Sequence, residues 1–179
     1  IASGVHMSPK DRANNAIVGD FDIEANLTLP FTKFFSNFGF IDKKRQRVDC
    51  SDMIDTMGIV CQGGKDSIGT LSGGNQQKVI VGRWLLKTCK LLILDEPFQG
   101  VDIKARRDIG THIRATSNNR ATLVFVSEID EAVEIADRII VLHEKAVVGE
   151  HVNKNIDLPE LLSQVSGNSN TLKQAESLQ

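Results

Sequence analysis

The chain has 179 residues, of which 41% are hydrophobic and 25% are charged, and its formal net charge is -2. This length allows one globular domain with its own core, and the small net charge gives no sign of a nucleic-acid or anionic-membrane surface. No apolar run reaches membrane-spanning length, and the three cysteines lack paired metal-ligand spacing, which predicts free thiols in a reducing cytoplasm.

The first expected element is a short strand over residues 4–8, which Pro9 ends, and polar residues 10–15 follow as a turn. Further on, phenylalanines recur at helical spacing, a pattern more typical of a buried helix face than of a ligand site: Phe31, Phe34, Phe35 and Phe38. We therefore expect residues 21–60, together with a helix that begins near Ser72, to form a mostly helical subdomain.

From residue 90 onward, strands and helices are expected to alternate. Apolar or β-branched runs at 91–94, 122–126 and 138–142 predict strands of a sheet covered on both faces. Apolar residues at helical spacing predict one helix after Asp102, which can cap it, and another over residues 129–136. Because parallel strands need crossover connections, this order predicts a mainly parallel sheet with right-handed crossovers.

The last part of the chain carries weaker signals. Residues 146–152 are expected to form a further strand, and residues 158–165 a last helix. From Ser166 onward, the sequence is polar enough to predict disorder.

Two motifs carry the chemistry of this sequence. Residues 71–78 read Leu-Ser-Gly-Gly-Asn-Gln-Gln-Lys and predict a helix opening, where unsatisfied N–H groups and the positive end of the helix dipole attract phosphate oxygens. Residues 91–94 form an apolar run that ends in Asp95 and Glu96. A carboxylate at the end of a buried strand can hold hydrated Mg²⁺, and the next carboxylate can position a water molecule for attack. Together the motifs predict half of a nucleotide hydrolysis site.

These runs, with Gly100-Val101-Asp102 after them, resemble the ATP-binding subunits of ABC transporters. The form of the motifs is similar to that of sugar importers whose two ATPase domains are fused in one polypeptide. The resemblance extends from about residue 4 to residue 152 and is strongest to the C-terminal part of the second nucleotide-binding domain. It implies an α/β fold: a partial P-loop NTPase (RecA-like) with a mainly parallel sheet and a helical signature subdomain.

The resemblance also implies a division of the chain. Residues 1–20 would hold the first strand and a degenerate Q-loop, and residues 21–89 the helical subdomain that ends in the signature helix. Residues 90–152 would form the RecA-like core with the Walker B motif, the D-loop and the switch region. Residues 153–179 would form a C-terminal helix and a flexible tail.

For the acidic residues, the resemblance implies distinct roles. Glu96 would be the catalytic residue that orients or deprotonates the attacking water, and Asp95 would hold Mg²⁺, mostly through water. Asp102 would belong to the D-loop, which crosses to the partner subunit. A plain helix cap is an equally good interpretation of Asp102, and the two roles are compatible.

For the signature, the resemblance implies action in trans. In this family the signature of one ATPase domain closes over the ATP that the P-loop of the other domain holds. The nucleotide-binding residues would be Ser72, Gly73, Gly74, Asn75 and Gln76.

A P-loop of the form G-x-x-x-x-G-K-[ST] is absent from the sequence. The nearest run, residues 58–66, has one residue too many between Gly58 and Gly64, and it places Asp66 where a Mg²⁺-binding hydroxyl belongs. We interpret this run as an ordinary turn, because an acidic side chain there would repel phosphate. The expectation is that the chain is a fragment that begins downstream of its own P-loop, and that it is inactive alone.

Three further departures from the family pattern bear on activity. Ser127 stands at the position of the switch histidine, and a serine cannot titrate near pH 7. Lys10 stands where the Q-loop offers a glutamine, and a cation cannot ligate Mg²⁺. Phe98 and Gln99 replace the usual Thr-Arg pair. The first two put hydrolysis at the domain's own site in doubt.

The implied cofactors are ATP and Mg²⁺. The implied partners are the first ATPase domain of the same polypeptide or a second copy, membrane permease subunits and, indirectly, a periplasmic or surface sugar-binding protein; no nucleic acid is expected. The protein would lie peripherally at the cytoplasmic face of the cell membrane. The sugar itself is not predicted, because selectivity belongs to other subunits.

Two other functions remain open. One is the head domain of a DNA-maintenance ABC-type ATPase, which would normally show a long coiled coil before the signature and a basic DNA surface; the sequence has neither. The other is a non-catalytic pseudo-ATPase interaction module that only completes a partner's site. The missing P-loop, Lys10 and Ser127 favour that alternative.

Overall fold

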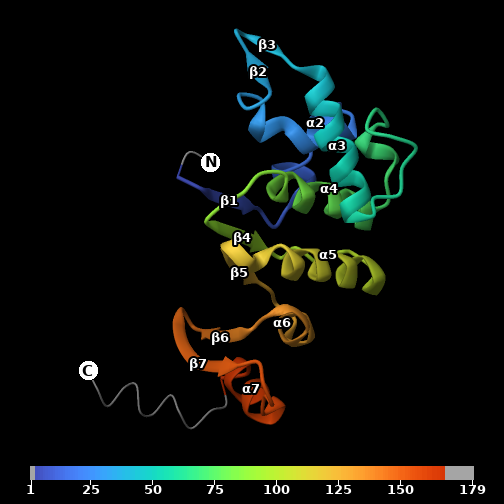
Figure 1. Cartoon of the computed structure of the whole chain (residues 1–179). Coiled ribbons are helices and arrows are strands. Elements are labelled where there is room, and N and C mark those ends of the chain that lie inside the picture. Colours follow the sequence, from blue (N-terminus) through green and yellow to red (C-terminus); the bar gives the residue numbers. More distant parts are fainter. Residues whose placement is uncertain (1–2, 168–179) are drawn as a thin grey trace. The chain divides into compact units, whose positions relative to one another are not determined.

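The computed structural model describes residues 3–167, which divide into two compact units, the first ending at Val126 and the second beginning at Ser127. Within the described residues, no helix combines the length and the apolar composition that a membrane crossing requires. The first unit contains a three-stranded parallel sheet and a mostly helical region, and the second contains a hairpin with two helices (Figure 1).

The parallel sheet has the strand order β1-β4-β5, with β1 at Val5–Ser8, β4 at Leu91–Asp95 and β5 at Ala121–Phe125. In the register, Val5 lies opposite Leu91, which lies opposite Ala121 on the other side. The central strand β4 buries Leu92 and Leu94 completely. The predicted strands at 4–8, 91–94 and 122–126 are thus confirmed, as is the α/β fold with a parallel sheet.

Between residues 21 and 90, the helical region comprises three α-helices: α2 (Ile23–Thr28), α3 (Lys43–Met57) and α4 (Gly73–Leu85), with short 3₁₀ turns η1 (Leu29–Phe31) and η2 (Ile68–Thr70). Helix α4 is the central element of the first unit, because it contacts α2, α3, α5 (Ile103–Ala115) and β1. Its residues Val79, Ile80 and Val81 are completely buried. These contacts on several sides explain why three consecutive apolar residues of the helix are all buried.

The prediction of a phenylalanine helix was wrong in part. Phe31 and Phe35 are buried, but Phe34 is 45% exposed and Phe38 is 96% exposed. The chain leaves η1 and reverses in a small hairpin formed by β2 (Ser36–Asn37) and β3 (Phe40–Ile41). Its two turn residues, Phe38 and Gly39, both have positive φ angles, 48° and 84°, and this backbone conformation cannot continue a helix.

The segment predicted as a turn over residues 10–15 contains one turn of helix, α1 (Arg12–Asn15). Asp11 caps it by accepting a hydrogen bond from the Asn14 backbone N–H at 3.1 Å. The hydrogen bonds to Asn14 hold the pKa of the Asp11 carboxyl below its usual value. A third short 3₁₀ turn, η3 (Ser117–Asn119), follows α5.

In the second unit, α6 (Ile129–Ile135), β6 (Arg138–His143), β7 (Ala146–Val152) and α7 (Leu158–Val165) fall where the sequence predicts elements. A small core holds Ile139, Val141 and Leu161, and the apolar face of α6 packs against it. The predicted disorder beyond Ser166 concerns residues that lie almost entirely outside the described range.

The prediction that residues 138–142 join the parallel sheet was wrong. Strand β6 pairs antiparallel with β7, and the register places Arg138 opposite Val152. Only Glu144 and Lys145 connect the two strands, both with positive φ. A connection of two residues forms a hairpin and is far too short for a parallel crossover.

Candidate functional site

The opening of α4 lies at the surface of the first unit and is capped by its own sequence. Ser72 is the N-cap residue and is exposed, and its hydroxyl oxygen accepts a hydrogen bond from the Asn75 backbone N–H at 3.4 Å. The Asn75 amide donates to the same oxygen at 3.1 Å and accepts from the Val60 N–H at 3.0 Å. The arrangement leaves an exposed hydroxyl at the positive end of a 13-residue helix.

The last residues of the signature serve the fold. Gln76 donates to the Ile68 carbonyl oxygen at 3.3 Å. Lys78 is buried, with 7% of its side chain exposed, and its ammonium donates to Asp108 at 2.7 Å and to the Gly58 carbonyl oxygen at 3.0 Å. These bonds join α4 to α5 and to the end of α3. Gly58 ends α3 in the left-handed conformation, so the run 58–66 is a helix end and a loop, as predicted.

Gly73 and Gly74 both lie in close contacts within the chain, and the contact at Gly74 is the less forgiving because it meets a fixed Cβ atom. A Cβ atom on Gly74 would lie 2.9 Å from the Cβ of Ala105 and 3.4 Å from an Asp102 carboxylate oxygen. A Cβ atom on Gly73 would lie 2.8 Å from the Arg12 guanidinium. The resemblance implies that these glycines bind a partner's nucleotide, and the structure shows that they also let α4 pack against α5 and Arg12.

Asp102 caps α5 by accepting a hydrogen bond from the Ala105 N–H at 2.9 Å, as the sequence predicts. The cap also places this carboxylate beside Gly74. Its role toward a partner subunit stays a prediction.

Arg12 is a residue that the sequence reasoning missed. Its guanidinium donates to the Gln99 carbonyl oxygen at 2.7 Å, and it lies against Gly73 and Gly100. Arg12 follows β1 and Gln99 follows β4, and neighbouring parallel strands end at the same edge of a sheet. That adjacency was the available signal, since a lone arginine after Pro9 matches no motif.

The positions of Asp95 and Glu96 are set by strand β4. Asp95 is the last residue of the strand, and the Glu96 N–H donates to the Phe125 carbonyl oxygen at 2.9 Å, next to the end of β5. Glu96 has a positive φ of 47°, which is uncommon for a glutamate and costs backbone energy. Strained residues of this kind cluster at functional sites, so the conformation supports a functional role for Glu96.

Lys10 lies next to the predicted catalytic carboxylate. Its ammonium nitrogen is 3.9 Å from Oε1 of Glu96, whose side chain is only 13% exposed, whereas that of Lys10 is 52% exposed. The loops after β1 and β4 therefore bring Lys10 and Glu96 together. Ser127 lies in the second unit, exposed, shortly before α6.

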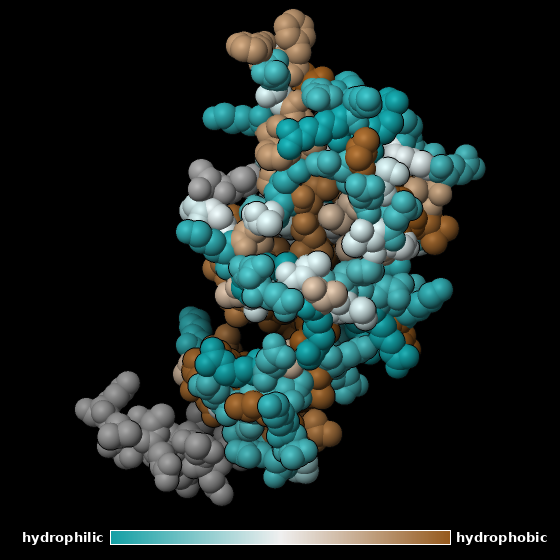
Figure 2. Space-filling view, viewed as in Figure 1, coloured by the Kyte–Doolittle hydropathy of each residue, from teal (hydrophilic) through white to brown (hydrophobic). Residues whose placement is uncertain are grey.

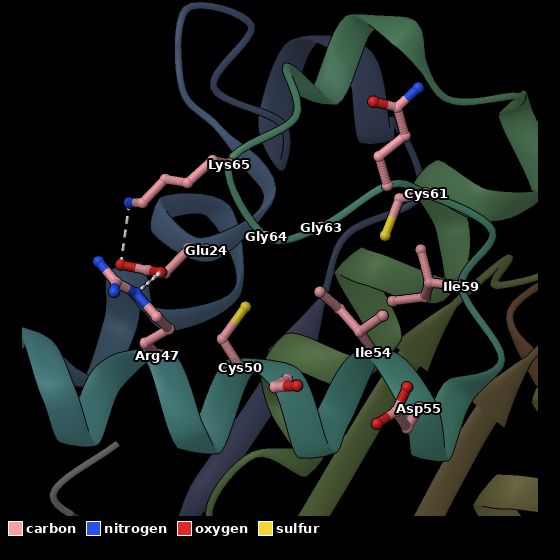
Figure 3. A pocket seen from close by; sticks show the side chains of 12 residues that line it. Glu24, Arg47, Cys50, Ile54, Asp55, Ile59, Cys61, Gly63, Gly64 and Lys65 are labelled. Carbon is pink, nitrogen blue, oxygen red and sulfur yellow. Dashed lines mark hydrogen bonds and ion pairs between the residues drawn. The ribbon is translucent and has the colours of Figure 1, made fainter.

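A separate hollow of about 310 Å³ lies in the helical region, and none of the predicted site residues lines it. Figure 3 shows its lining, in which the buried Glu24 carboxylate pairs with Lys65 at 3.0 Å and with Arg47 at 4.0 Å. The thiols of Cys50 and Cys61 also line it. All three cysteines, the third being Cys89, are free.

Burial raises the pKa of the Cys50 thiol to about 12, and the nearby carboxylates of Glu24 and Asp22 add to the shift. Compared with the ordinary value of 9.0, this leaves about 10³-fold less thiolate at pH 8. We therefore expect iodoacetamide to modify Cys50 at least 100-fold more slowly in the folded protein than in urea, measured by mass spectrometry. Equal rates in the two states would contradict the buried thiol.

The raised pKa of Cys50 also makes the stability of the fold depend on pH. The folded state holds the Cys50 proton more tightly than the unfolded state does, so the free energy of unfolding should fall as the pH rises from about 9 to about 12. Cys50→Ser should remove much of that decline. Cys89→Ser is the comparison and should remove less of it, because burial raises the pKa of the half-buried Cys89 thiol in the same direction but by less.

Comparison with known proteins adds an independent finding. The sequence profile of the ABC transporter family matches residues 6–99. The chain is 35% identical over 168 residues to the Ribose import ATP-binding protein RbsA of Streptococcus agalactiae serotype III, covering 93% of the chain and 34% of that protein. It is 36% identical over 151 residues to the Ribose import ATP-binding protein RbsA 2 of Streptomyces coelicolor, covering 84% of the chain and 29% of that protein. The chain therefore spans about a third of the length of these relatives.

Solved structures agree on the fold. A dimeric ATP-binding cassette in a post-hydrolysis state, bound to ADP and phosphate, superposes with a TM-score of 0.69 at 20% identity, covering 86% of this chain and 65% of that one. A bacterial Atm1-family ABC exporter with ATP bound superposes with a TM-score of 0.66 at 18% identity, covering 98% of this chain and 28% of that one. At these identities the likeness concerns the fold alone.

Proposed function

Because the chain belongs to the ABC transporter family, whose profile matches residues 6–99, we propose that it is the part of a carbohydrate importer's ATPase that lends its signature to ATP held by a partner domain. The chain is an ABC transporter ATPase domain homologous to ribose import ATP-binding proteins. The finer assignment, to the second of two fused nucleotide-binding domains, rests on the form of the signature and on its departures from the family pattern.

The observation that carries the proposal is the opening of α4. The exposed Ser72 hydroxyl and the first N–H groups of the helix are suited to phosphate oxygens, which a helix dipole also favours. The same 179 residues contain no G-x-x-x-x-G-K-[ST] string with which to hold an ATP of their own. The phosphate at this opening is therefore proposed to belong to ATP bound by another domain.

The residues of the domain's own catalytic site fit Mg-ATP less well. The carboxylates of Asp95 and Glu96 are ligands that Mg²⁺ accepts. However, the Lys10 ammonium lies 3.9 Å from Glu96, and a second cation there would be repelled. This ion pair favours the second candidate function, a pseudo-ATPase whose own site stays idle while its signature serves the partner.

The remaining assignments follow from the proposal. The cofactors would be ATP and Mg²⁺, bound mainly by the partner domain, and the partners would be that ATPase domain and the permease subunits of a sugar importer. A peripheral position at the cytoplasmic face of the cell membrane follows from the same partners. The three-stranded sheet and α4 would correspond to the core and signature regions, with the domain boundaries predicted from the sequence.

The test combines this chain with a purified P-loop-bearing ATPase domain of a ribose import ATP-binding protein. The chain alone is expected neither to hydrolyse ATP nor to bind Mg-ATP with micromolar affinity in calorimetry, because the phosphate cradle is missing. Added to the P-loop domain, it should raise ATP turnover at least tenfold. Ser72→Ala should abolish that gain, and Ser51→Ala, on the exposed face of α3, should not.

Glu96→Gln separates the two candidate functions in the same assay. If the signature acts in trans and the domain's own site is idle, this variant should stimulate the partner as well as the unchanged chain does. A loss as large as that of Ser72→Ala would show that Glu96 takes part in turnover. Full stimulation by Ser72→Ala would overturn the proposed function.

A further inference from the structure

We propose that residues 33–47 form an element that binds anionic lipid bilayers directly, with Phe38 and Phe40 entering the membrane interface. The inference does not depend on the proposed function. It begins with the small hairpin of β2 and β3, where Phe38 is 96% exposed and Phe40 is 81% exposed. Figure 2 shows apolar surface at the end of the first unit where Figure 1 places this hairpin.

The aromatic tip works against the stability of the fold. Burial of a phenylalanine side chain stabilises a fold, and these two side chains gain almost none of that stabilisation. Phe38 also has a positive φ of 48° in a two-residue turn, at a position where asparagine or glycine is preferred. A bulky side chain is thus held at the apex of the hairpin at an energetic cost, and folding alone does not explain it.

The base of the hairpin is firmly held. Phe35 is buried, and its carbonyl oxygen accepts a hydrogen bond from the Asp42 N–H at 2.8 Å. The Phe34 ring lies between two cations, with the Arg45 guanidinium carbon 4.2 Å and the Lys87 nitrogen 3.8 Å from its centre. The tip is therefore presented from a fixed base.

Charge around the hairpin identifies the occupant. Although the whole chain carries a net charge of -2, residues 33–47 contain one acidic side chain, Asp42, and five exposed cationic ones: Lys33, Lys43, Lys44, Arg45 and Arg47. The net charge of the chain hides this local excess, which is why the composition gave no sign of an anionic-membrane surface. Aromatic residues that enter the interface, with lysine and arginine around them, are the pattern of interfacial lipid binding.

A lipid surface fits this shape better than a protein does. The two exposed rings project from a convex tip, and a protein partner would need a matching apolar pocket, whereas a bilayer interface accommodates projecting rings without one. Each lysine or arginine near an anionic surface contributes about 1 kcal/mol, which corresponds to a factor of about five in partitioning. Two inserted rings and several cations together would give measurable binding.

The test is co-sedimentation of the 179-residue chain with vesicles of phosphatidylcholine containing 30% phosphatidylglycerol, and with vesicles of phosphatidylcholine alone. We expect binding to the anionic vesicles, at least tenfold weaker binding to the neutral ones, and weakening by salt. The double variant Phe38→Ser/Phe40→Ser should reduce binding at least tenfold, as should Lys43→Gln/Lys44→Gln. The matched control is Val60→Ser/Ile103→Ser, which removes two apolar side chains exposed elsewhere, by 75% and 62%.

A second measurement uses tryptophan fluorescence to test directly whether the hairpin tip enters the bilayer. The variant Phe40→Trp should show a blue-shifted emission in the presence of anionic vesicles and quenching by brominated lipid, relative to the unchanged chain with its single Trp84. Circular dichroism checks that each variant is folded. Equal binding by the unchanged chain and the Phe38→Ser/Phe40→Ser variant would overturn the proposal. The absence of binding to the anionic vesicles would overturn it as well.

Discussion

Replacing Gly74 with aspartate is expected to lower the free energy of unfolding of the first unit by about 3–5 kcal/mol. The new Cβ would lie 2.9 Å from the Cβ of Ala105, in a contact that is buried and holds α4 against α5. The new carboxylate would face that of Asp102, one of whose oxygens lies 3.4 Å from the Cβ position. Steric overlap and like-charge repulsion therefore act together.

Chemical unfolding followed by circular dichroism measures this loss. The matched control is Gly19→Asp, because a Cβ on Gly19 meets nothing within 4 Å. Stimulation of a partner's ATP turnover should disappear with the Gly74 variant, since the opening of α4 is displaced. A Gly74→Asp protein as stable as the control would show that α4 and α5 can separate at this contact without cost.

A double-mutant cycle isolates the contact itself. Gly74→Ala should cost about 1–3 kcal/mol by overpacking, and Ala105→Gly about 1 kcal/mol by its helix propensity. Because the two Cβ atoms compete for one space, the double variant should be more stable than the sum of the two losses implies. Strict additivity would contradict the close packing.

Replacing Arg83 with methionine is the second change with a large expected effect. The Arg83 side chain is buried, and its guanidinium donates to the Asn26 carbonyl oxygen at 2.6 Å, to the Ala16 carbonyl oxygen at 2.7 Å and to the Asn26 side-chain oxygen at 3.1 Å. Burial lowers the pKa of this group to about 10. Methionine would preserve most of the packing of the stem and leave three acceptors without this donor.

The expected loss is about 3–5 kcal/mol in the free energy of unfolding, since each buried acceptor left without a partner costs about 1–3 kcal/mol. The stability of Arg83→Lys should lie between that of the unchanged chain and that of Arg83→Met, because lysine keeps the charge but lacks the planar fork that reaches two carbonyl groups at once. Lys104→Met, at an exposed position of α5, is the control. A loss below about 1 kcal/mol for Arg83→Met would show that Ala16 and Asn26 are satisfied by other donors.

The sequence predicted those elements in which one periodic pattern matches one structure. Strand β4 and the elements β7 and α7 lie within a residue or so of their predicted bounds, and helix α5 begins after Asp102, as predicted. The predictions failed where a backbone turn, rather than the spacing of apolar residues, decided the structure. The spacing of Phe34 and Phe38 fits a helix, but the positive φ angles at Phe38 and Gly39 turn the chain into a hairpin.

Strand pairing was the other source of error. An apolar run such as residues 138–142 predicts a strand but does not show which strand it pairs with. The two-residue turn after it makes β7 the partner. At the candidate site, the motifs predict roles for Ser72, Asp95 and Glu96 from the chemistry of their residue types, and these roles stay predictions. The contacts of Arg12 and Lys10 depend on which strands end side by side, and only the assembled sheet shows that.

The packing of Arg12 against Gly73 links two positions that are far apart in the sequence. The guanidinium fills the space that any side chain at residue 73 would need, since a Cβ there would lie 2.8 Å from Arg12 Nη2. A side chain at position 73 would therefore have to push the guanidinium aside, which would give up its bond to Gln99, and it would still meet the Gly100 carbonyl oxygen at 3.3 Å. Among homologous sequences, an arginine at position 12 is therefore expected to occur together with a glycine at position 73.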